Sequence, residues 1–255
     1  MFYKIKYHIG NGEKQSHKKL IYKNYLDMSV DEITYKLIEE NNDIIIEELK
    51  EKLKDYDTIY IIGKGDTATY IDKENTVGIN QAIIFTKFNF LFLNDFLSFN
   101  GLDEYIKKIK YIFIPDYPHN FIKSSSLGRL SSDNFNYKNV IKYLKDNFFQ
   151  GKVFFYQIQT TKSSKTLKHK FESKTSSDLP VQFFSKFLQK KKYVCYGIGV
   201  TNKYHPDLKK LKFDNTNKFF ENNTREKLNK SVSYKFKEHM ESFKQSKLID
   251  EIQFH

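Results

Sequence analysis

Two of the seven histidines in this chain are candidates for acid–base chemistry. His205 stands before Pro206 in a polar segment that follows a predicted strand, and His119 follows the turn 115–118. A neutral imidazole can accept the proton of an attacking hydroxyl group, which is the task of a general base in group transfer. A surface turn at His205-Pro206 is an equally good explanation, so both interpretations stay open.

Small and polar residues follow several predicted strands, and they are the candidate ligand-binding residues. Glycine lets a ligand approach the backbone, and exposed amide groups bind phosphate oxygens. Turn formation and capping are the alternatives for the Asn and Asp members of the set. The set comprises Gly63, Lys64, Gly65, Asp66, Thr67, Asn80, Gln81, Asn94, Asp95 and Gly197.

The glycine loop 63–67 does not fit the two common phosphate-binding motifs. Gly63-x-Gly65 lacks the third glycine of a dinucleotide-binding turn, because Ala68 occupies that place. Only about ten residues separate Gly65 from the next predicted strand, which is too few for a full crossover helix. No Gly-Lys-Ser/Thr follows at the spacing of a P-loop.

Predicted strands and helices alternate along the chain, and they must position these residues. Apolar runs predict strands at 58–62, 76–80, 89–93, 111–114, 152–157, 192–196 and 248–254. Helical periodicity predicts helices at 102–108, 137–148, 179–189 and 225–243. This alternation predicts an α/β fold with an open, mostly parallel, Rossmann-like sheet flanked by helices. Ligands of such sheets bind outside the carboxyl ends of the strands.

The first 56 residues are expected to form a small hairpin and helix element, and residues 57–255 the main α/β domain. Alternation in 2–9 followed by Asn11-Gly12 predicts a β-hairpin within residues 1–27. Ser29 and Glu32 form a capping box that begins a helix, which we expect to be broken near Asn41-Asn42. The Lys/Ser/Thr-rich stretch 160–177 is expected to be a mobile loop.

Four short motifs, in their order along residues 57–205, resemble the small bacterial sialyltransferases that use CMP-activated sialic acid. In that family the first strand ends in Gly-Asn-Gly-Pro-Ser, the next in Asn-Gln and a third in asparagine. A Thr-Ser-Gly turn later opens a helix that leads to a strand and Gly-Ile-Asp. The matching segments here are 63–67, Asn80-Gln81, Asn94, Thr175-Ser176-Ser177 and Gly197-Ile198-Gly199.

The resemblance implies a metal-independent, inverting glycosyltransferase whose donor is a nucleotide-activated sugar, with CMP as the carrier and no separate cofactor. It implies that Gly63, Gly65, Asn80, Asn94 and Ser176 contact the cytidine, ribose and phosphates. It also adds Thr175 and Tyr204 to the candidate binding residues. His205 or His119 would take the proton of a glycan or other hydroxyl acceptor. Asp66-Thr67 replaces Pro-Ser and Gly199 replaces the aspartate, which motivates the alternative of a non-catalytic nucleotide- or nucleic-acid-binding protein.

Composition limits the partners and the location. The formal charge is +12, but only Arg129 and Arg225 are arginine, whereas dedicated nucleic-acid surfaces usually use arginine forks. The basic helix, extended to 225–247, is expected to be a solvated face or to lie on an anionic membrane surface. The lone Cys195 excludes an intramolecular disulfide, and neither a signal peptide nor a membrane span is predicted. We therefore expect a cytoplasmic protein, soluble or peripheral to a membrane.

Overall fold

The computed structural model describes residues 3–4, 21–22, 32–93, 102, 104–115, 143–144, 146–148, 150–158, 167–172, 175–198, 203–211 and 224–255. Four predicted site residues lie outside these ranges: His119, Asn94, Asp95 and Gly199. The first three were expected to bind ligand or take a proton, and those roles stay predictions.

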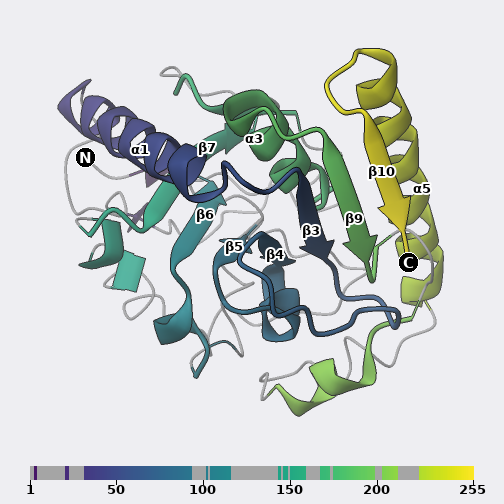
Figure 1. The fold of residues 1–255 in the computed structure, drawn as a ribbon. Helices are drawn as coiled ribbons and strands as arrows, with labels where there is room; N and C mark the ends of the chain where they lie inside the picture. Colours follow the sequence, from purple (N-terminus) through teal and green to yellow (C-terminus); the bar gives the residue numbers. More distant parts are fainter. Residues whose placement is uncertain are drawn as a thin grey trace.

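The main sheet has eight strands, and every neighbouring pair is parallel. Its order is β10-β9-β3-β4-β5-β6-β7-β8. The predicted α/β fold with an open, parallel sheet flanked by helices is confirmed (Figure 1). The strands are β3 (Thr58–Ile62), β4 (Thr76–Ile79), β5 (Phe90–Phe92), β6 (Tyr111–Pro115), β7 (Val153–Ile158), β8 (Lys170–Phe171), β9 (Lys192–Tyr196) and β10 (Glu251–Phe254).

The order in which successive strands are added across this sheet changes direction between β3 and β9. From β3 it adds β4, β5, β6, β7 and β8 in sequence on one side, and then returns to place β9 and β10 on the other side of β3. The helix α3 (Asp178–Leu188) makes this return between β8 and β9. The carboxyl ends of β3 and β9 therefore flank the topological switch point, where open parallel sheets bind their ligands.

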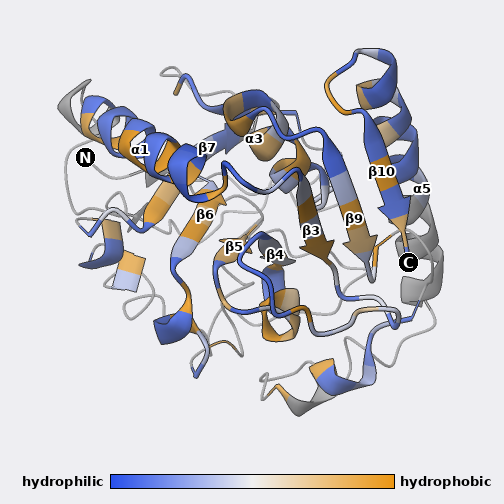
Figure 2. Ribbon diagram, in the orientation of Figure 1, coloured by the Kyte–Doolittle hydropathy of each residue, from blue (hydrophilic) through white to orange (hydrophobic). Residues whose placement is uncertain are grey.

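Helices and short turns cover the two faces of the sheet. One face packs against α1 (Glu32–Lys52), α3 and α5 (Thr224–Gln245), through a core that includes Ile45, Phe183 and Met240 (Figures 1 and 2). The other face is covered by the 3-10 helices η1 (Asn80–Phe85), η3 (Ile106–Lys108) and η5 (Pro206–Lys210), and by Leu144 and Phe148. Burial on both faces is why β4, β5 and β6 contain almost no exposed positions.

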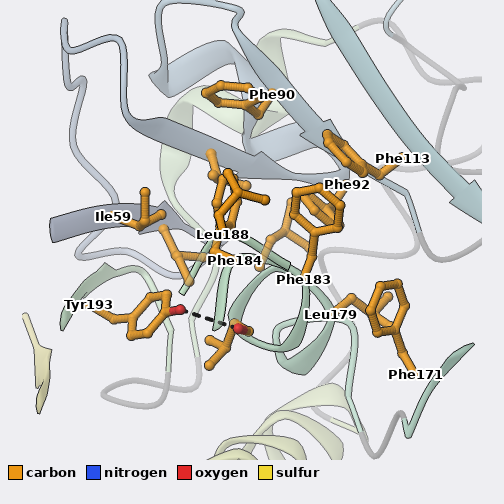
Figure 3. Close-up of a cluster of buried hydrophobic side chains, with 14 of the residues drawn as sticks. Ile59, Phe90, Phe92, Phe113, Phe171, Leu179, Phe183, Phe184, Leu188 and Tyr193 are labelled. Atoms are coloured by element: carbon orange, nitrogen blue, oxygen red, sulfur yellow. Dashed lines mark hydrogen bonds between the residues drawn. The ribbon is translucent and has the colours of Figure 1, made fainter. Parts of the chain in front are cut away.

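Phenylalanines fill the space between α3 and the middle of the sheet (Figure 3). Phe92 of β5 stacks on Phe113 of β6 with ring centroids 4.1 Å apart. Phe183 of α3 meets Phe113 edge to face at 4.6 Å, and Phe184 meets Phe90 at 5.8 Å. Edge-to-face and offset contacts between aromatic rings stabilise a fold by more than the burial of their area alone. These contacts therefore fix the rotation of α3 about its own axis relative to the sheet.

The helix α1 runs without interruption through Asn41 and Asn42, so the predicted break at these residues is wrong. Asn42 is fully buried; its Nδ2 donates to the carbonyl of Phe155 at 2.7 Å, and its Oδ1 accepts from the Phe155 amide at 3.1 Å. The neighbouring Asn41 donates to the carbonyl of Val153 at 2.9 Å. Both amides thus bond to the backbone of β7, on which α1 packs, and they do not end the helix.

Several other boundaries differ from the predictions. Asn80 begins η1 and does not end a strand, the expected helix 102–108 is helical only as the 3-10 helix η3, and the expected loop 160–177 contains β8. The strands predicted at 58–62, 152–157 and 192–196 and the helices predicted at 179–189 and 225–243 are confirmed to within two residues.

At the amino end, β1 (Tyr3–Lys4) pairs antiparallel with β2 (Ile21–Tyr22) as a separate two-stranded sheet. The predicted turn at Asn11-Gly12 lies outside the described residues. The helix α1 packs against the main sheet through Ile45, Leu49 and Leu53. The division of the chain at residue 56 stays a prediction. Among the helices that the structure describes, none is long and apolar enough to cross a membrane.

Candidate functional site

The glycine loop (residues 63–67) and the turn after β9 (residues 197–198, the β9 turn) meet at the switch point. They are neighbours because Ile62 and Tyr196, the last residues of β3 and β9, are paired in register. Figure 1 shows that β3, β9 and β10 end at the same edge of the sheet. Residues that follow these three strands therefore share one region, which includes Gly63, Gly65 and Gly197.

The three glycines of this region pack backbone against backbone. A Cβ atom on Gly63 would lie 2.6 Å from the carbonyl oxygen of Gly197, and one on Gly65 would lie 2.8 Å from the same atom. The amides of Gly63 and Gly65 donate to the carbonyls of Tyr196 and Gly197, both at 2.8 Å. These two amide groups are satisfied within the protein, so glycine here permits contact between the glycine loop and the β9 turn.

Thr67 fastens the same corner through its hydroxyl group. Its Oγ1 donates to the carbonyl of His255, just after β10, at 2.7 Å and accepts from the Gly197 amide at 3.0 Å. The Ala68 amide returns to the carbonyl of Gly65 at 2.9 Å and tightens the loop. Thr67 thus links the ends of β3, β9 and β10.

Residues 203–211, called the strap here, lie against the glycine loop. Tyr204 forms an antiparallel bridge with Gly65, the Asp66 amide donates to the Lys203 carbonyl at 3.0 Å, and the His205 amide donates to the Lys64 carbonyl at 2.9 Å. Leu208 and Leu211 anchor the strap in a small apolar cluster with Ile62, Ala68, Ala82 and Phe85. The strap therefore brings Tyr204 and His205 against the glycine loop at the carboxyl end of β3, and the roles proposed for them stay predictions.

Lys64 of the glycine loop, Gln81 of η1 and Tyr204 of the strap lie close together. Lys64 Nζ lies 3.4 Å from Gln81 Oε1 and 5.5 Å from the ring centre of Tyr204. Gln81 and its neighbour Asn80 are both buried. Asn80 has a backbone φ of 53°, a left-handed conformation that asparagine tolerates better than most residues. The ammonium group and the amide make this a region suited to an anionic ligand.

His205 occupies the N-cap position of η5. Its Nδ1 accepts a hydrogen bond from the Asp207 amide at 3.2 Å, and the Asp207 carboxylate oxygen Oδ2 lies 3.8 Å from the same nitrogen. The ring meets Phe85 edge to face, with centroids 4.6 Å apart. An accepting Nδ1 places the proton of the neutral imidazole on Nε2.

Thr175 and Ser176 are at the start of α3, in a second polar group. The amide and the hydroxyl of Thr175 donate to the fully buried carboxylate of Asp178, at 2.9 and 3.0 Å. His239 of α5, which is also buried, places Nδ1 2.9 Å from Asp178 Oδ2 without hydrogen-bond alignment. Thr175 thus bonds to Asp178 at the start of α3, and Asp178 adjoins α5 through His239; these described contacts do not extend to the glycine loop.

The sequence analysis did not single out His255 or Tyr196, although both adjoin the glycine loop. Their rings stack with centroids 4.9 Å apart and an interplanar angle of 18°. His255 is exposed and lies directly after β10, and Tyr196 ends β9. A signal was available, since both residues stand at the carboxyl end of a predicted parallel strand.

No cluster of three or more His, Cys, Asp or Glu side chains suited to a metal ion occurs within the part of the chain that the structure describes. Comparison of the chain with protein-family models, curated proteins and solved structures finds no match.

Proposed function

We propose that this chain is a glycosyltransferase that binds a nucleotide-activated sugar at the carboxyl ends of β3, β4 and β9, with a CMP-sugar such as CMP-sialic acid as the favoured donor. One observation carries the proposal: the glycine loop, Asn80-Gln81, Tyr204 and His205 converge at the topological switch point of an all-parallel sheet. Ligands of open α/β sheets bind at this place.

The charges in the region support an anionic donor. Lys64 and Gln81 present an ammonium group and an amide beside the strap. The whole chain, at a formal charge of +12, attracts anionic substrates at low ionic strength. The glycine loop is held by the β9 turn and by Thr67, so the binding groups are positioned before a ligand arrives.

The proposed reaction is a direct displacement at the anomeric carbon with inversion. The acceptor hydroxyl oxygen forms the new bond, and the bond between the sugar and the nucleotide phosphate breaks, with its electron pair leaving on the phosphate. A histidine, His119 or His205, takes the acceptor proton.

A thermal-shift screen with CMP, UMP, UDP, GDP and AMP tests the site. A nucleotide that binds only the folded chain stabilises it by about 2.7 kcal/mol at a concentration of 100 times its Kd. For a chain of this size that gain raises Tm by roughly 5–10 °C. A shift with CMP supports the cytidine-activated donor, and a shift with another nucleotide changes the donor; no shift with any of the five would contradict the proposal.

Asn80→Gly is the sharpest variant for this screen, because glycine tolerates the left-handed backbone while the amide side chain is removed. The shift caused by CMP should disappear in Asn80→Gly and in Gln81→Ala. Gln245→Ala removes an exposed amide at the end of α5 and should retain the full shift. Full shifts in all three variants would disprove the assignment of these residues.

The second candidate is a non-catalytic protein that binds a nucleotide or a nucleic acid at the same edge. Two observations favour it: the amides of Gly63 and Gly65 are satisfied internally, and Nδ1 of His205 is occupied by a cap. Incubation with CMP-sialic acid separates the candidates, since a transferase releases CMP and a binding protein returns the donor unchanged. A nucleic-acid role predicts steeply salt-dependent binding and indifference to free CMP.

A further inference from the structure

The hydrogen bond from the Asp207 amide determines which nitrogen of His205 can face a ligand. Because Nδ1 accepts this bond, the neutral ring carries its proton on Nε2. A general base needs an unprotonated nitrogen aimed at the substrate, and in this arrangement the unprotonated nitrogen points at the backbone of η5. The nitrogen left for a ligand is a donor.

The described residues assign no partner to Nε2 of His205. The ring is held on one side by Phe85, and its backbone amide is bonded to the Lys64 carbonyl. Only 22% of the side chain is exposed, so the imidazole is held in place and still reaches solvent. A fixed, partly buried N–H group with no assigned partner is suited to bind an oxygen atom of a ligand.

The neighbouring groups determine the charge of that oxygen. The residue bonded to the His205 backbone is Lys64, whose ammonium group lies beside Gln81 and Tyr204. An ammonium group together with an N–H donor favours an anionic oxygen, and hydrogen bonds to charged groups are stronger than those to neutral ones. The carboxylate contact described for the ring, from Asp207 Oδ2, is made to Nδ1 at 3.8 Å, on the side of the ring that accepts the cap bond.

We propose that His205 acts as a neutral hydrogen-bond donor, through Nε2–H, to the phosphate of the bound nucleotide, and that it is not the base. This inference rests on the proposed function, since it assigns a role within the same site. During transfer, the bond from the anomeric carbon to the phosphate oxygen breaks and its electron pair stays on that oxygen. Nε2–H stabilises the resulting negative charge without giving up its proton, as neutral imidazoles can. The acceptor proton passes to a separate base, for which the chain offers His119.

Two substitutions separate the two functions of the His205 ring, which are the cap of η5 through Nδ1 and the hydrogen-bond donor at Nε2. His205→Asn places an amide oxygen near the position of Nδ1, so it keeps the cap of η5 and loses the distant donor. His205→Gln reaches to the position of Nε2 with an amide N–H and loses the cap. Gln245→Ala is the control, because Gln245 is an exposed side chain at the end of α5.

The experiment measures the affinity of each variant for CMP and for cytidine, with a thermal melt to establish folding. We expect His205→Asn to weaken CMP binding by about 10-fold or more and cytidine binding by less than about 2-fold. His205→Gln should retain CMP affinity within several-fold, and Gln245→Ala should match the wild type.

The outcomes separate this inference from the proposed function. If the wild type binds CMP and His205→Asn binds it equally well, the donor role is overturned and the nucleotide site remains. An equal loss of CMP and cytidine affinity would also overturn it, because the lost contact would not be to phosphate. A wild type that binds none of the nucleotides overturns the proposed function and this inference with it.

Discussion

At the scale of single residues, the glycines of the candidate site contribute close packing. Gly197 has a φ of 64°, and its Cβ position lies 2.7 Å from the carbonyl oxygen of Gly63. Gly63 and Gly65 present their backbones to the same turn. The site is therefore built on a contact that any side chain at these positions would open.

Gly197→Ala should destabilise the chain by about 3 kcal/mol or more, because strain at positive φ adds to a clash with the Gly63 carbonyl. Gly151→Ala is the matched control, since Gly151 has a φ of 68° and no heavy atom within 4 Å of its Cβ position. It should lose only about 1 kcal/mol. Urea unfolding measures both changes, and equal losses would show that the close packing has no energetic weight.

At the scale of elements, two asparagines join α1 to β7. The strand β8 covers β7 only at Gln157 and Ile158, and Asn41 and Asn42 bond to backbone groups of β7 nearer its start. Asn42 satisfies both the N–H and the C=O of Phe155, as a neighbouring strand would. Polar side chains in the middle of a helix can thus be explained by the backbone that they pair with.

Asn42→Ala should lower the free energy of unfolding by about 3 kcal/mol, because it removes two hydrogen bonds from the buried backbone of Phe155. Asn41→Ala removes one bond from a half-buried side chain and should lower it by about 1 kcal/mol. Chemical denaturation of the two variants gives the comparison. Similar small losses would mean that water replaces the Asn42 bonds.

His169 makes the same contact sensitive to pH. Burial, opposed by the charge of Asp43, lowers the pKa of His169 to about 4 from an ordinary value of 6.5. Its Nδ1 lies 3.2 Å from Asn42 Nδ2, and Nε2 lies 3.4 Å from a carboxylate oxygen of Asp43. Between about pH 4 and 6.5, this imidazole is therefore neutral in the folded chain and protonated in the unfolded chain.

Stability should therefore fall as pH decreases from about 6.5 to 4, by up to about 3 kcal/mol from this group, and should lose nothing further from it below pH 4. His169→Asn retains an acceptor for Asn42 and removes the titration. The unfolding free energy of the wild type minus that of the variant should fall by that amount between pH 7.5 and pH 4. A difference independent of pH would contradict the expected pKa.

At the scale of the whole molecule, the return of the chain through α3 creates the candidate site. Because β9 is placed on the other side of β3 from β4, segments 134 positions apart, Gly63 and Gly197, come into contact. Thr67 adds the end of β10 to the same corner. The site therefore depends on β9 and β10, which come last in the chain, as well as on β3, the first strand of the main sheet.

Thr67→Val should lower Tm, because the methyl group that replaces the hydroxyl leaves the Gly197 amide and the His255 carbonyl without this partner; the expected loss is about 2 kcal/mol. Thr67→Ser keeps both bonds and should lose much less. Hydrogen exchange of the Gly197 amide should accelerate in the valine variant. Unchanged exchange would show that Thr67 does not hold the β9 turn.

Local sequence patterns were sufficient for most elements. Apolar runs bounded by glycine, proline or asparagine located β3, β7 and β9, and helical periodicity located α3 and α5. The same patterns failed at Asn41-Asn42, because the backbone of β7 satisfies both amides. They also failed at residues 160–177, where the pairing of β8 with β7 is a long-range contact.

For the candidate site, the sequence by itself determined that glycines, amides and histidines follow predicted parallel strands, since the carboxyl ends of parallel strands lie at one edge of a sheet. Tertiary structure alone decided which of these residues meet. It brought Lys64, Gln81, Tyr204 and His205 together, placed Thr175 against Asp178, and added Tyr196 and His255. The physical reason is that the order of the strands in the sheet and the tautomer of His205 depend on contacts between distant segments. Local propensity does not encode these contacts.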